Sequence, residues 1–519
     1  MMRIGVDVGG TNTDAVLLDG NTIRAAIKTP TTADVISGVT KALSHVLADV
    51  KALDDVQAVM IGTTHFTNAV IERRGLSKVA VIRIGLPAAA SILPFADWPP
   101  DLVDVVKGPI FMLAGGNEFD GRPIVAFDHA GMRRVAATIR DSGIKAVAIT
   151  AVFSPLIADC ENAAAAILAE LAPNVTVTRS SELGRIGLIE RENATILNSA
   201  LQGLARQTVA AFHQALVQSR LSGPLYLTQN DGTLIGAAVA EHLPVLCFSS
   251  GPTNSMRGAH LLSGLADAIV LDVGGTTTDA GRLKDGFPRQ ANTQVDIGGV
   301  RTFFRMPDVV AIALGGGTVI REQPLAVGPD SVGYELLTKA RANGGDTLTL
   351  TDVGVKLGLI ELGDQDSLDD LPAGLIASVQ DWLTVRLAEL VDRMKTSAGD
   401  LPVVAVGGGA FLVPDSLPGV SRVIKVENAG IANAVGAAMS QVSGESERIF
   451  HGVQRSDAIA QTLDLAREQA IAAGAAADSL TVLDIEDTPM SYVPGEPLRV
   501  RVRVIGDLRD RSSHSEQRK

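Results

Sequence analysis

The chain has 519 residues, of which 46% are hydrophobic and 20% are charged, and its formal net charge is −13 at pH 7. This length predicts two or three domains with large cores. The acidic balance and the lack of a basic stretch argue against binding of nucleic acid, which usually needs clustered lysine and arginine. The most apolar stretches are shorter than the ~18 residues that a membrane span needs, so we expect no membrane association.

The start of the chain and its cysteines indicate the compartment. The first residues enter a strand almost at once, without the charged and then apolar segment of an export signal. The two cysteines, Cys160 and Cys247, form no CxxC pair, which argues against a disulfide framework or a cysteine-bound metal. We therefore expect two buried free thiols and a cytoplasmic protein.

Strand and helix patterns alternate through the first part of the chain. Short apolar runs predict strands at 4–8, 15–18, 56–61, 79–84 and 147–152. Apolar residues at helical spacing predict helices at 33–50, 67–74, 130–142 and 193–220. Such alternation is typical of a mostly parallel sheet with helices on both faces.

The second half of the chain continues this pattern and then changes. Strands are predicted at 269–273, 280–283 and 403–406, and helices at 371–394 and 431–440, the last rich in small residues. After Ser443, a helix at 463–477 and paired strands at 480–485 and 498–504 predict a small α+β appendage. Residues 510–519 are predicted to be a polar, disordered tail.

One nine-residue phrase occurs twice, each time directly after a short apolar run. Residues 7–15 read DVGGTNTDA and residues 272–280 read DVGGTTTDA, so that only Asn12 and Thr277 differ. A Gly-Gly pair allows a tight turn between two strands and exposes successive N–H groups that can hold phosphate. A plain hairpin turn would explain one copy of the phrase. Turn geometry alone does not explain why both copies have the same two aspartates.

The aspartate that opens each phrase follows a strand, at the edge where open α/β sheets bind ligands. A carboxylate there can hold Mg²⁺, usually through water, or polarise a nucleophile. A third glycine cluster at 407–409 follows the strand 403–406 and would let backbone lie against a flat base or ribose. A similar cluster at 315–317 is a weaker signal.

Taken in this order, the two phosphate turns, the glycine-rich turn and the small-residue helix resemble the acetate kinase, sugar kinase, Hsp70 and actin superfamily. The phrases at 6–16, 62–73, 249–259, 271–281, 315–318 and 348–352 are similar to the ATP-binding hydantoinase A type of chain in the hydantoinase/oxoprolinase family. The resemblance covers about residues 2–440. It implies an α/β fold of two similar actin/Hsp70-like ATPase-type domains, with mixed sheets and flanking helices, around a nucleotide cleft.

The resemblance also implies the domain boundaries. The first ATPase-type domain would span 1–190 and the second 191–445, with the last helix of the second packing back toward the first. Residues 446–509 would form the C-terminal appendage and 510–519 the tail.

By resemblance, family members use ATP and Mg²⁺ to activate the ring carbonyl of a cyclic amide, such as a hydantoin, 5-oxoproline or a related lactam, for hydrolysis. Asp7 and Asp272 would hold Mg²⁺ and arrange the reacting groups. Asp14 and Asp279 are further catalytic candidates, and their alternative role is to brace the turns by hydrogen bonds. The expected nucleotide-binding residues are Gly9, Gly10, Thr11, Asn12, Thr13, Gly274, Gly275, Thr276, Thr277, Thr278, Gly407, Gly408 and Gly409.

The stretch 62–73 supplies the candidate substrate residues His65, Asn68, Glu72 and Arg73, because loops that follow strands often carry function. A helix cap with a surface ion pair of Glu72 explains the same residues equally simply. Residues 250–252, Ser-Gly-Pro, either belong to the site or form a rigid turn that supports the second domain.

Three classes of function stay open from the sequence. The first is an ATP-dependent cyclic amidohydrolase or its ATP-binding subunit, working with a hydantoinase B type partner and expected to be oligomeric. The others are a small-molecule kinase and a non-catalytic ATP-binding regulatory subunit. The phrases at 62–73 and 249–259 favour the first class.

Overall fold

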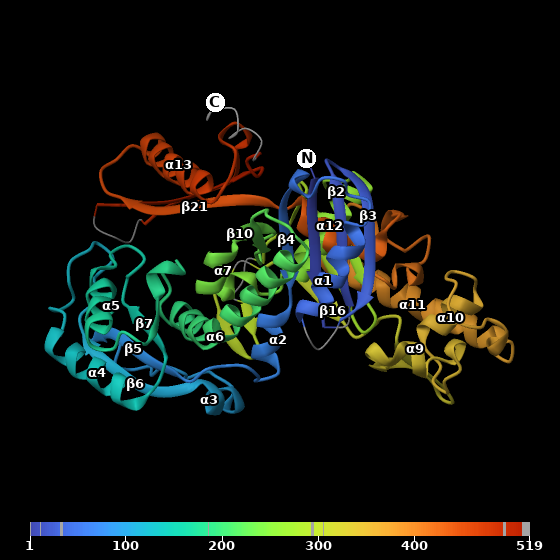
Figure 1. Ribbon diagram of the computed structural model, residues 1–519, viewed down its shortest axis with the longest axis horizontal. Helices are drawn as coiled ribbons and strands as arrows, with labels where there is room; N and C mark the ends of the chain where they lie inside the picture. The colour runs from blue at the N-terminus through green and yellow to red at the C-terminus, as the bar shows by residue number, and fades with distance from the viewer. Residues whose placement is uncertain are drawn as a thin grey trace.

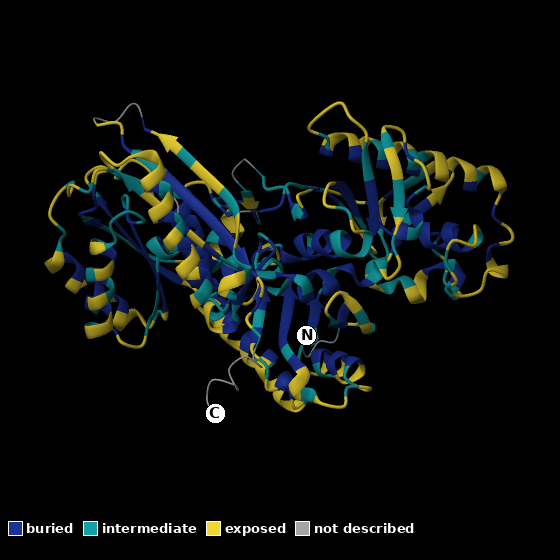
Figure 2. Ribbon diagram, turned by 90° about the horizontal axis from the view of Figure 1, so that it is seen from above, coloured by how far each residue is buried: buried dark blue, intermediate teal, exposed yellow. Residues whose placement is uncertain are grey.

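The computed structural model describes residues 2–10, 12–31, 35–184, 186–291, 295–304, 306–490 and 495–510. Its largest element is a nine-stranded sheet in the order β22-β23-β21-β10-β9-β4-β1-β2-β3 (Figure 1). Strands of the central sheets are largely buried, whereas the outer faces of the peripheral helices are exposed (Figure 2). Thr11 and residues 511–519 of the expected tail lie outside the described residues.

The first repeated phrase lies near one edge of this sheet. β1 (Met2–Val8) pairs antiparallel with β2 (Asn12–Asp19), which pairs with β3 (Thr22–Pro30). On its other side β1 pairs in parallel with β4 (Val56–Thr63). Helices α1 (Val35–Val46) and α6 (Leu188–Gln218) form part of one core cluster with the apolar side chains of β1 and β4.

The second repeated phrase lies in a second sheet of the same design. β11 (Ala268–Val273) pairs antiparallel with β12 (Thr278–Lys284) and in parallel with β19 (Leu401–Val406). β13 (Phe287–Pro288) and β16 (Val309–Ile312) pair with β12, and β20 (Val420–Lys425) pairs with β19. Both halves therefore consist of a strand, its return strand and a parallel neighbour.

A four-stranded parallel sheet, in the order β6-β5-β7-β8, forms a separate layer at one end of the molecule (Figure 1). It contains β5 (Val79–Leu86), β6 (Lys107–Ala114), β7 (Ala146–Ala151) and β8 (Thr176–Arg179), and α4 (His129–Ser142) and α5 (Asp159–Leu171) pack on it. A buried ion pair between Arg83 of β5 and Glu192 of α6 fastens this layer to the main sheet.

Helices α8 (Ser250–Ser263) and α12 (Ala432–Met439) cross between the two main sheets. Their backbones touch, because a Cβ atom at Gly258 would lie 2.0 Å from the Ala432 carbonyl oxygen, and one at Gly436 would lie 1.8 Å from the Asn254 carbonyl oxygen. Gly5 of β1 makes an equally close approach to Ala434. Glycine is therefore required at all three positions, which explains the small residues of the predicted helix 431–440.

The C-terminal elements extend the nine-stranded sheet. β21 (Gln441–Phe450) pairs in parallel with β10 (Thr233–Gly236) and antiparallel with β23 (Leu498–Gly506), which pairs with β22 (Thr481–Pro489). α13 (Arg455–Ala472) covers the valine face of β23. The two strands expected near 480–485 and 498–504 are thus paired as predicted, and they continue a sheet that begins at the N-terminus.

The remaining elements connect these layers. The helices are α2 (His65–Ile71), α3 (Pro100–Val106), α7 (Ala237–His242), α9 (Leu336–Lys339), α10 (Leu350–Lys356) and α11 (Ala373–Met394). The strands are β9 (Leu225–Thr228), β14 (Val295–Ile297), β15 (Val300–Thr302), β17 (Thr318–Glu322) and β18 (Leu325–Ser331). No helix within the described ranges has the length and apolar character to cross a bilayer. Both cysteines are free, but only Cys247 is buried, and Cys160 is partly exposed because it lies in the first turn of α5.

Candidate nucleotide site

The two repeated phrases fold into the same hairpin. Asp7 lies opposite Asp14 in the β1–β2 pair, and Asp272 lies opposite Asp279 in the β11–β12 pair. The backbone N–H of Gly9 donates to Asn12 over 3.0 Å, and that of Gly274 donates to Thr277 over 2.9 Å. The repeat in sequence is therefore a repeat in backbone geometry, down to the hydrogen bond that closes each turn.

Both hairpins face one cavity of about 380 Å³ between the two main sheets. Asn12 and Asp14 line it from the first hairpin, and Asp272, Gly274, Gly275, Thr277 and Asp279 line it from the second. The predicted glycines 407–409 line it as well. Leu336, Ile360, Leu362 and Phe411 supply an apolar wall next to these glycines, as a flat base requires.

Asp7 and several other predicted residues of the two turns do not line the cavity, and Asp7 is connected to it through its neighbours Asp14 and Asn433. Thr13 and Thr278 are buried, and Thr278 donates to the Leu314 carbonyl over 2.7 Å, so these hydroxyls hold the hairpins. Gly10 and Thr276 are exposed, and Gly9 is partly exposed. Thr11 falls outside the described residues.

One lysine, Lys28, lies near three of the four acidic residues of the hairpins, Asp7, Asp14 and Asp272. Lys28 of β3 donates to Asp14 over 2.8 Å, and also to the Gly430 carbonyl over 3.0 Å. Burial, the charge of Asp14 and further carboxylates raise the pKa of Asp7 to about 7. Burial and the charge of Asp272 raise the pKa of Asp279 to about 7. Burial also raises the pKa of Asp14 and Asp272.

This arrangement costs folding free energy. Like charges directly opposite each other on paired strands are destabilising, and here the pair occurs twice. Groups with strongly perturbed pKa values inside a cleft are typical of binding and catalytic sites. The carboxylates are therefore better explained by a ligand than by the stability of the fold.

A chain of polar contacts connects Asp7 and Asp272 across the cleft. The Asn433 amide of α12 donates to Asp7 Oδ2 over 3.3 Å. The Asn433 side-chain oxygen contacts the Ser255 hydroxyl of α8, and this hydroxyl donates to Asp272 Oδ2. The two aspartates thus belong to one network, and the two crossing helices hold it.

The residues at the cavity fit a divalent cation that is held partly through water. Asp7 Oδ1 and Asp14 Oδ1 are buried and have no hydrogen-bond partner, which leaves two oxygen atoms for a cation or its water ligands. In the part of the chain that the structure describes, no three acidic, histidine or cysteine side chains converge closely enough to bind an ion by themselves.

Glycine is needed beside both central aspartates. A Cβ atom at Gly62, at the end of β4, would lie 2.8 Å from Asp7 Oδ1. A Cβ atom at Gly407, just after β19, would lie 2.3 Å from Asp272 Oδ1, and Gly407 also has φ +86°. Both carboxylates therefore occupy space that any side chain on the neighbouring parallel strand would fill.

The glycine cluster at 315–317 braces the second turn. The N–H groups of Gly316 and Gly317 donate to the carbonyls of Gly274 and Gly275 over 2.9 and 2.7 Å. A Cβ atom at Gly315 would lie 2.6 Å from the backbone of Gly275. This cluster therefore holds the turn by backbone contact, and Gly316 also lines the cavity.

The four candidate substrate residues separate into two groups. His65 begins α2 and its Nδ1 lies 2.6 Å from the Thr63 hydroxyl, and burial lowers its pKa. The Asn68 amide lies close to Gly10 of the first turn. Glu72 and Arg73 follow the last turn of α2, where Glu72 is exposed and Arg73 pairs with Asp101 over 2.9 Å. The structure thus brings His65 and Asn68 near the first turn and places Glu72 and Arg73 at the opposite end of the helix.

Residues 250–252 form the first turn of α8. Ser250 is buried and its hydroxyl donates to the Thr63 carbonyl over 3.4 Å, and the Ser249 N–H donates to the Thr67 hydroxyl over 3.0 Å. The expected rigid turn is therefore a helix start. It fastens the stretch 62–73 to the central helices.

Sequence reasoning did not single out Lys28, Ser255 or Asn433 as members of the site. Ser255 and Asn433 lie inside the phrase 249–259 and the small-residue helix, which were noted for other reasons. A polar residue in an otherwise small and apolar helix, as Asn433 is, is the only local signal. The approach of Lys28 depends on the antiparallel pairing of β2 with β3, which has no sequence motif.

Known proteins share this architecture. The crystal structure of the ATP-dependent caprolactamase from Pseudomonas jessenii aligns with a TM-score of 0.77 at 18% identity, over 98% of this chain and 88% of that chain. A nucleotide-free acetone carboxylase structure aligns with a TM-score of 0.69 at 17% identity and the same coverage. These likenesses confirm the predicted α/β fold with two ATPase-type domains.

Sequence comparison finds relatives that are longer than this chain. The caprolactamase subunit alpha of Pseudomonas jessenii is 25% identical over 70% of this chain and 55% of its own length. 5-Oxoprolinase 1 of Arabidopsis thaliana is 23% identical over 69% of this chain and 31% of its own length. The chain thus spans less than two thirds of these curated relatives.

Family models account for most of the chain. The model of the hydantoinase/oxoprolinase N-terminal region matches residues 3–172, and the hydantoinase/oxoprolinase model matches residues 191–406. Together they include both repeated phrases and the parallel strand beside each. The chain therefore belongs to the hydantoinase/oxoprolinase family.

Proposed function

We propose that this chain is the ATP-binding part of an enzyme that hydrolyses a cyclic amide, such as a hydantoin, 5-oxoproline or a related lactam. One observation carries the proposal: two identical aspartate hairpins face a single cavity that also has an apolar wall for a base. The family and the relatives named above support the class of substrate. A hydantoinase B type subunit is the proposed partner, in an oligomeric and cytoplasmic enzyme.

In this proposal the two turns hold the phosphates of ATP, and residues 407–409 lie against the adenosine. Asp7 and Asp272 would hold Mg²⁺ through water, and the ion would neutralise charge on the phosphates. Asp14 and Asp279 complete the acidic set. His65 and Asn68 are the substrate candidates closest to the first turn, and Glu72 and Arg73 would act only through a different arrangement of α2.

The chemistry follows from the poor reactivity of an amide. The ring carbonyl oxygen attacks the γ-phosphorus and ADP leaves, which turns the carbonyl oxygen into a good leaving group. Water then adds to the activated carbon and the ring C–N bond breaks, which leaves an acyl phosphate. A second water attacks the carbonyl carbon of this acyl phosphate, so that the carboxylate forms and phosphate departs with the former carbonyl oxygen. A carboxyl group with a pKa near 7, as Asp279 has, can exchange the required protons at neutral pH.

Release of ADP tests this proposal. The purified protein is incubated with ATP, Mg²⁺ and a panel of hydantoins and lactams, with and without a hydantoinase B type subunit. We expect ADP release that a cyclic amide stimulates and that matches ring opening in amount. No stimulation under any combination would contradict the proposal, and a phosphorylated product that persists without ring opening would indicate a small-molecule kinase.

A further inference from the structure

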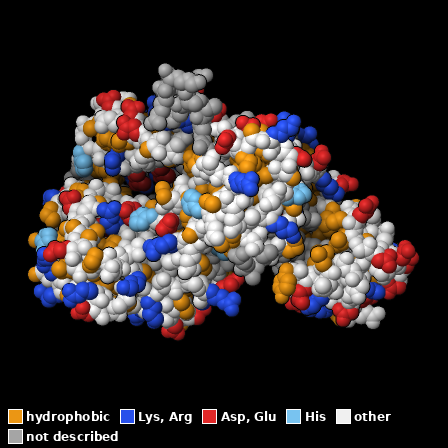
Figure 3. Space-filling model, viewed as in Figure 1, with side chains coloured by type: hydrophobic (Ala, Val, Ile, Leu, Met, Phe, Trp, Pro, Cys, Tyr) orange, Lys and Arg blue, Asp and Glu red, His pale blue; other side chains and the backbone are white. Residues whose placement is uncertain are grey.

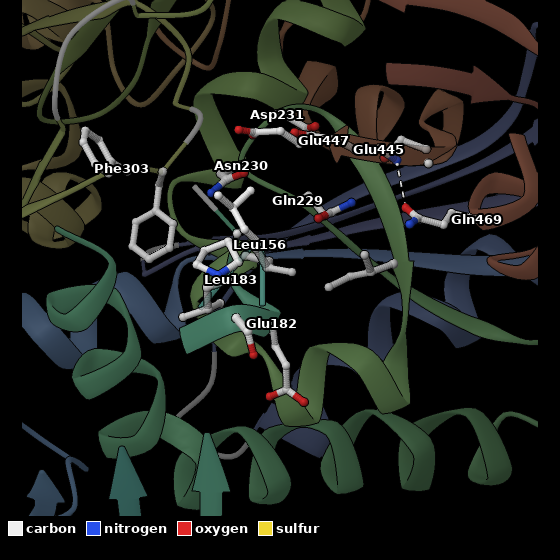
Figure 4. Close-up of a pocket in the computed structure, with 18 residues that line it drawn as sticks. Leu156, Glu182, Leu183, Gln229, Asn230, Asp231, Phe303, Glu445, Glu447 and Gln469 are labelled. Atoms are coloured by element: carbon white, nitrogen blue, oxygen red, sulfur yellow. Dashed lines mark hydrogen bonds between the residues drawn. The ribbon is translucent and has the colours of Figure 1, made fainter. Parts of the chain in front are cut away.

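A second cavity, of about 470 Å³, lies outside the nucleotide site (Figure 4). Three segments that directly follow parallel strands line it: Pro155 and Leu156 after β7, residues 181–184 after β8 and residues 229–231 after β9. β21 and α13 close it from the other side with Glu445, Glu447 and Gln469. The carboxyl ends of parallel strands are where α/β sheets bind ligands, and the volume is in the range of small-molecule sites.

Carboxylates line this second cavity. The arginines that pair with them are not among the lining residues. Glu182, Asp231, Glu445 and Glu447 line it, whereas the described lining residues include no lysine or arginine. Asp231, Glu445 and Glu447 pair with the arginines of β23 at 2.9, 3.2 and 2.6 Å. Figure 3 shows the hollow below the C-terminal elements with acidic side chains inside it. The lining therefore presents carboxylates, each already paired with an arginine that is not itself a lining residue.

The carboxylate of Glu182 stays ionised at any physiological pH. Burial acts to raise its pKa, but hydrogen bonds from His242 and Arg179 outweigh burial and lower it to about 2. Arg179 and His242, which bind the two carboxylate oxygens of Glu182, do not line the cavity. The carboxylate of Glu182 is therefore already paired within the protein.

A second feature of the cavity calls for a hydrogen-bond acceptor. Asn230 is 4% exposed, and its side-chain Nδ2 is buried without a hydrogen-bond partner. Figure 4 places Asn230 on the wall beside Asp231. A buried amide donor needs a hydrogen-bond partner, which a bound molecule or an ordered water would supply. Apolar side chains, Leu156, Leu246, Phe303 and Phe304, line the space as well.

We propose that this second cavity binds a linear amino acid. The ammonium group, the carboxylate oxygens and the methylene chain of the ligand would all contact the protein. The carboxylates would take the ammonium, Asn230 would donate to the carboxylate of the ligand, and the phenylalanine and leucine side chains would contact the methylenes. Opening of a lactam ring releases a compound of this class, so the link to the reaction, as a product site, rests on the proposed function. Binding of the amino acid to this cavity does not depend on the proposed function.

Calorimetric titration of the full chain without ATP tests the inference. The probes are 6-aminohexanoate and 4-aminobutanoate, with hexanoate as the control that lacks the ammonium and hexylamine as the control that lacks the acceptor. We expect an amino acid to bind at least about tenfold more tightly than either control, because each control loses one charged hydrogen-bonding group. Equal binding of all four probes, or no binding, would overturn the inference.

Two variants locate the site. Asn230→Asp removes the amide donor, and Glu447→Gln removes one carboxylate at nearly constant shape. Each variant is expected to weaken binding of the amino acid at least about tenfold. Asp279→Asn, in the nucleotide cavity, should leave the affinity unchanged. Unchanged affinity in the folded variants of the second cavity would contradict the assignment. Lactam-stimulated ADP release without amino-acid binding would refute this inference alone, whereas binding without that release would refute the proposed function alone.

Discussion

The buried carboxylates of the two hairpins reduce the stability of the unliganded protein. Asp279 has a pKa of about 7 in the folded chain against an ordinary value of 3.8, because burial and the charge of Asp272 disfavour its ionised form. The folded state therefore binds this proton more tightly than the unfolded state. It follows that stability falls as the pH rises from about 4 through 7, and the full cost is present above pH 7.

Replacement of Asp279 should therefore stabilise the free protein in a pH-dependent way. Asp279→Asn keeps the shape and removes the charge, so we expect Tm to rise by about 2–4 °C at pH 8 and by less at pH 5. Thermal unfolding followed by circular dichroism at both pH values measures this. Asp267→Asn, at an exposed position just before β11, is the control and should change neither value. A gain of equal size at pH 5 and pH 8 would show that the ionisation of Asp279 is not the cause.

Asp272 is the residue on which turnover should depend most. Asp272→Ala removes a partly exposed carboxylate from the cavity wall, so we expect the fold to persist while ATP turnover falls at least about 100-fold. Circular dichroism and an ADP-release assay measure the two effects, with Asp267→Ala as the control. Full turnover in Asp272→Ala would remove this residue from the mechanism.

Asn433 should set the pH dependence of turnover through Asp7. Its hydrogen bond lowers the pKa of Asp7 against the larger effect of burial, so the pKa should rise when the bond is lost. For Asn433→Ala we expect the acidic limb of kcat/KM to move upward by about half to one pH unit. A loss of turnover at every pH with an unshifted limb would show that Asn433 has only a structural role.

The aspartates of the site were predictable from the sequence because they lie in a repeated phrase next to recognisable strands. Their partners were not. Lys28 reaches Asp14 through strand pairing, and Ser255 and Asn433 meet where two helices from distant parts of the chain cross. Side chains that are brought together by tertiary packing leave no local pattern.

At the scale of elements, the crossing of α8 and α12 positions the site. The helices approach until backbone meets backbone, because Gly258 and Gly436 leave no side chain in between. This contact fixes the distance between Ser255 and Asn433, and so between the two aspartates. The dependence of the site on two glycines outside it is a testable feature of the fold.

A methyl group at the crossing should separate the helices. Gly436→Ala places a Cβ atom 1.8 Å from the Asn254 carbonyl oxygen, so we expect a loss of about 1–3 kcal/mol in the free energy of unfolding, with reduced turnover. Urea unfolding measures the change. Gly374→Ala, at a helical position of α11 with open space around it, is the control and should be neutral or stabilising. Equal stability of both variants would contradict the close crossing.

Most strands and long helices were predictable from apolar runs and spacing, because both main sheets are buried on two faces. α8 was not predicted as a helix, since its start reads Ser-Gly-Pro and resembles a turn. β3 and β9 were missed as well. β3 is half-exposed and carries few apolar residues in sequence, and β9 has only four residues, so neither makes a distinctive run.

At the scale of the molecule, one nine-stranded sheet carries both cavities near the carboxyl ends of its parallel strands. β1 and β4 lead to the nucleotide site, while β9 leads to the second cavity. The residues after 445, expected to be a separate appendage, complete the sheet and one wall of that cavity. The order of strands could not be predicted, because β10 and β21 pair across about half the chain.

The central claim is that ATP phosphorylates the ring carbonyl of a cyclic amide in the cavity between the two hairpins. The fate of the carbonyl oxygen tests it most directly. A lactam or hydantoin that stimulates ADP release is labelled with ¹⁸O at the ring carbonyl, and the phosphate formed with the complete enzyme is analysed by mass spectrometry. The account predicts one ¹⁸O atom in phosphate for each ring opened, and none with Asp272→Ala. Ring opening that leaves all of the label in the amino acid would contradict it.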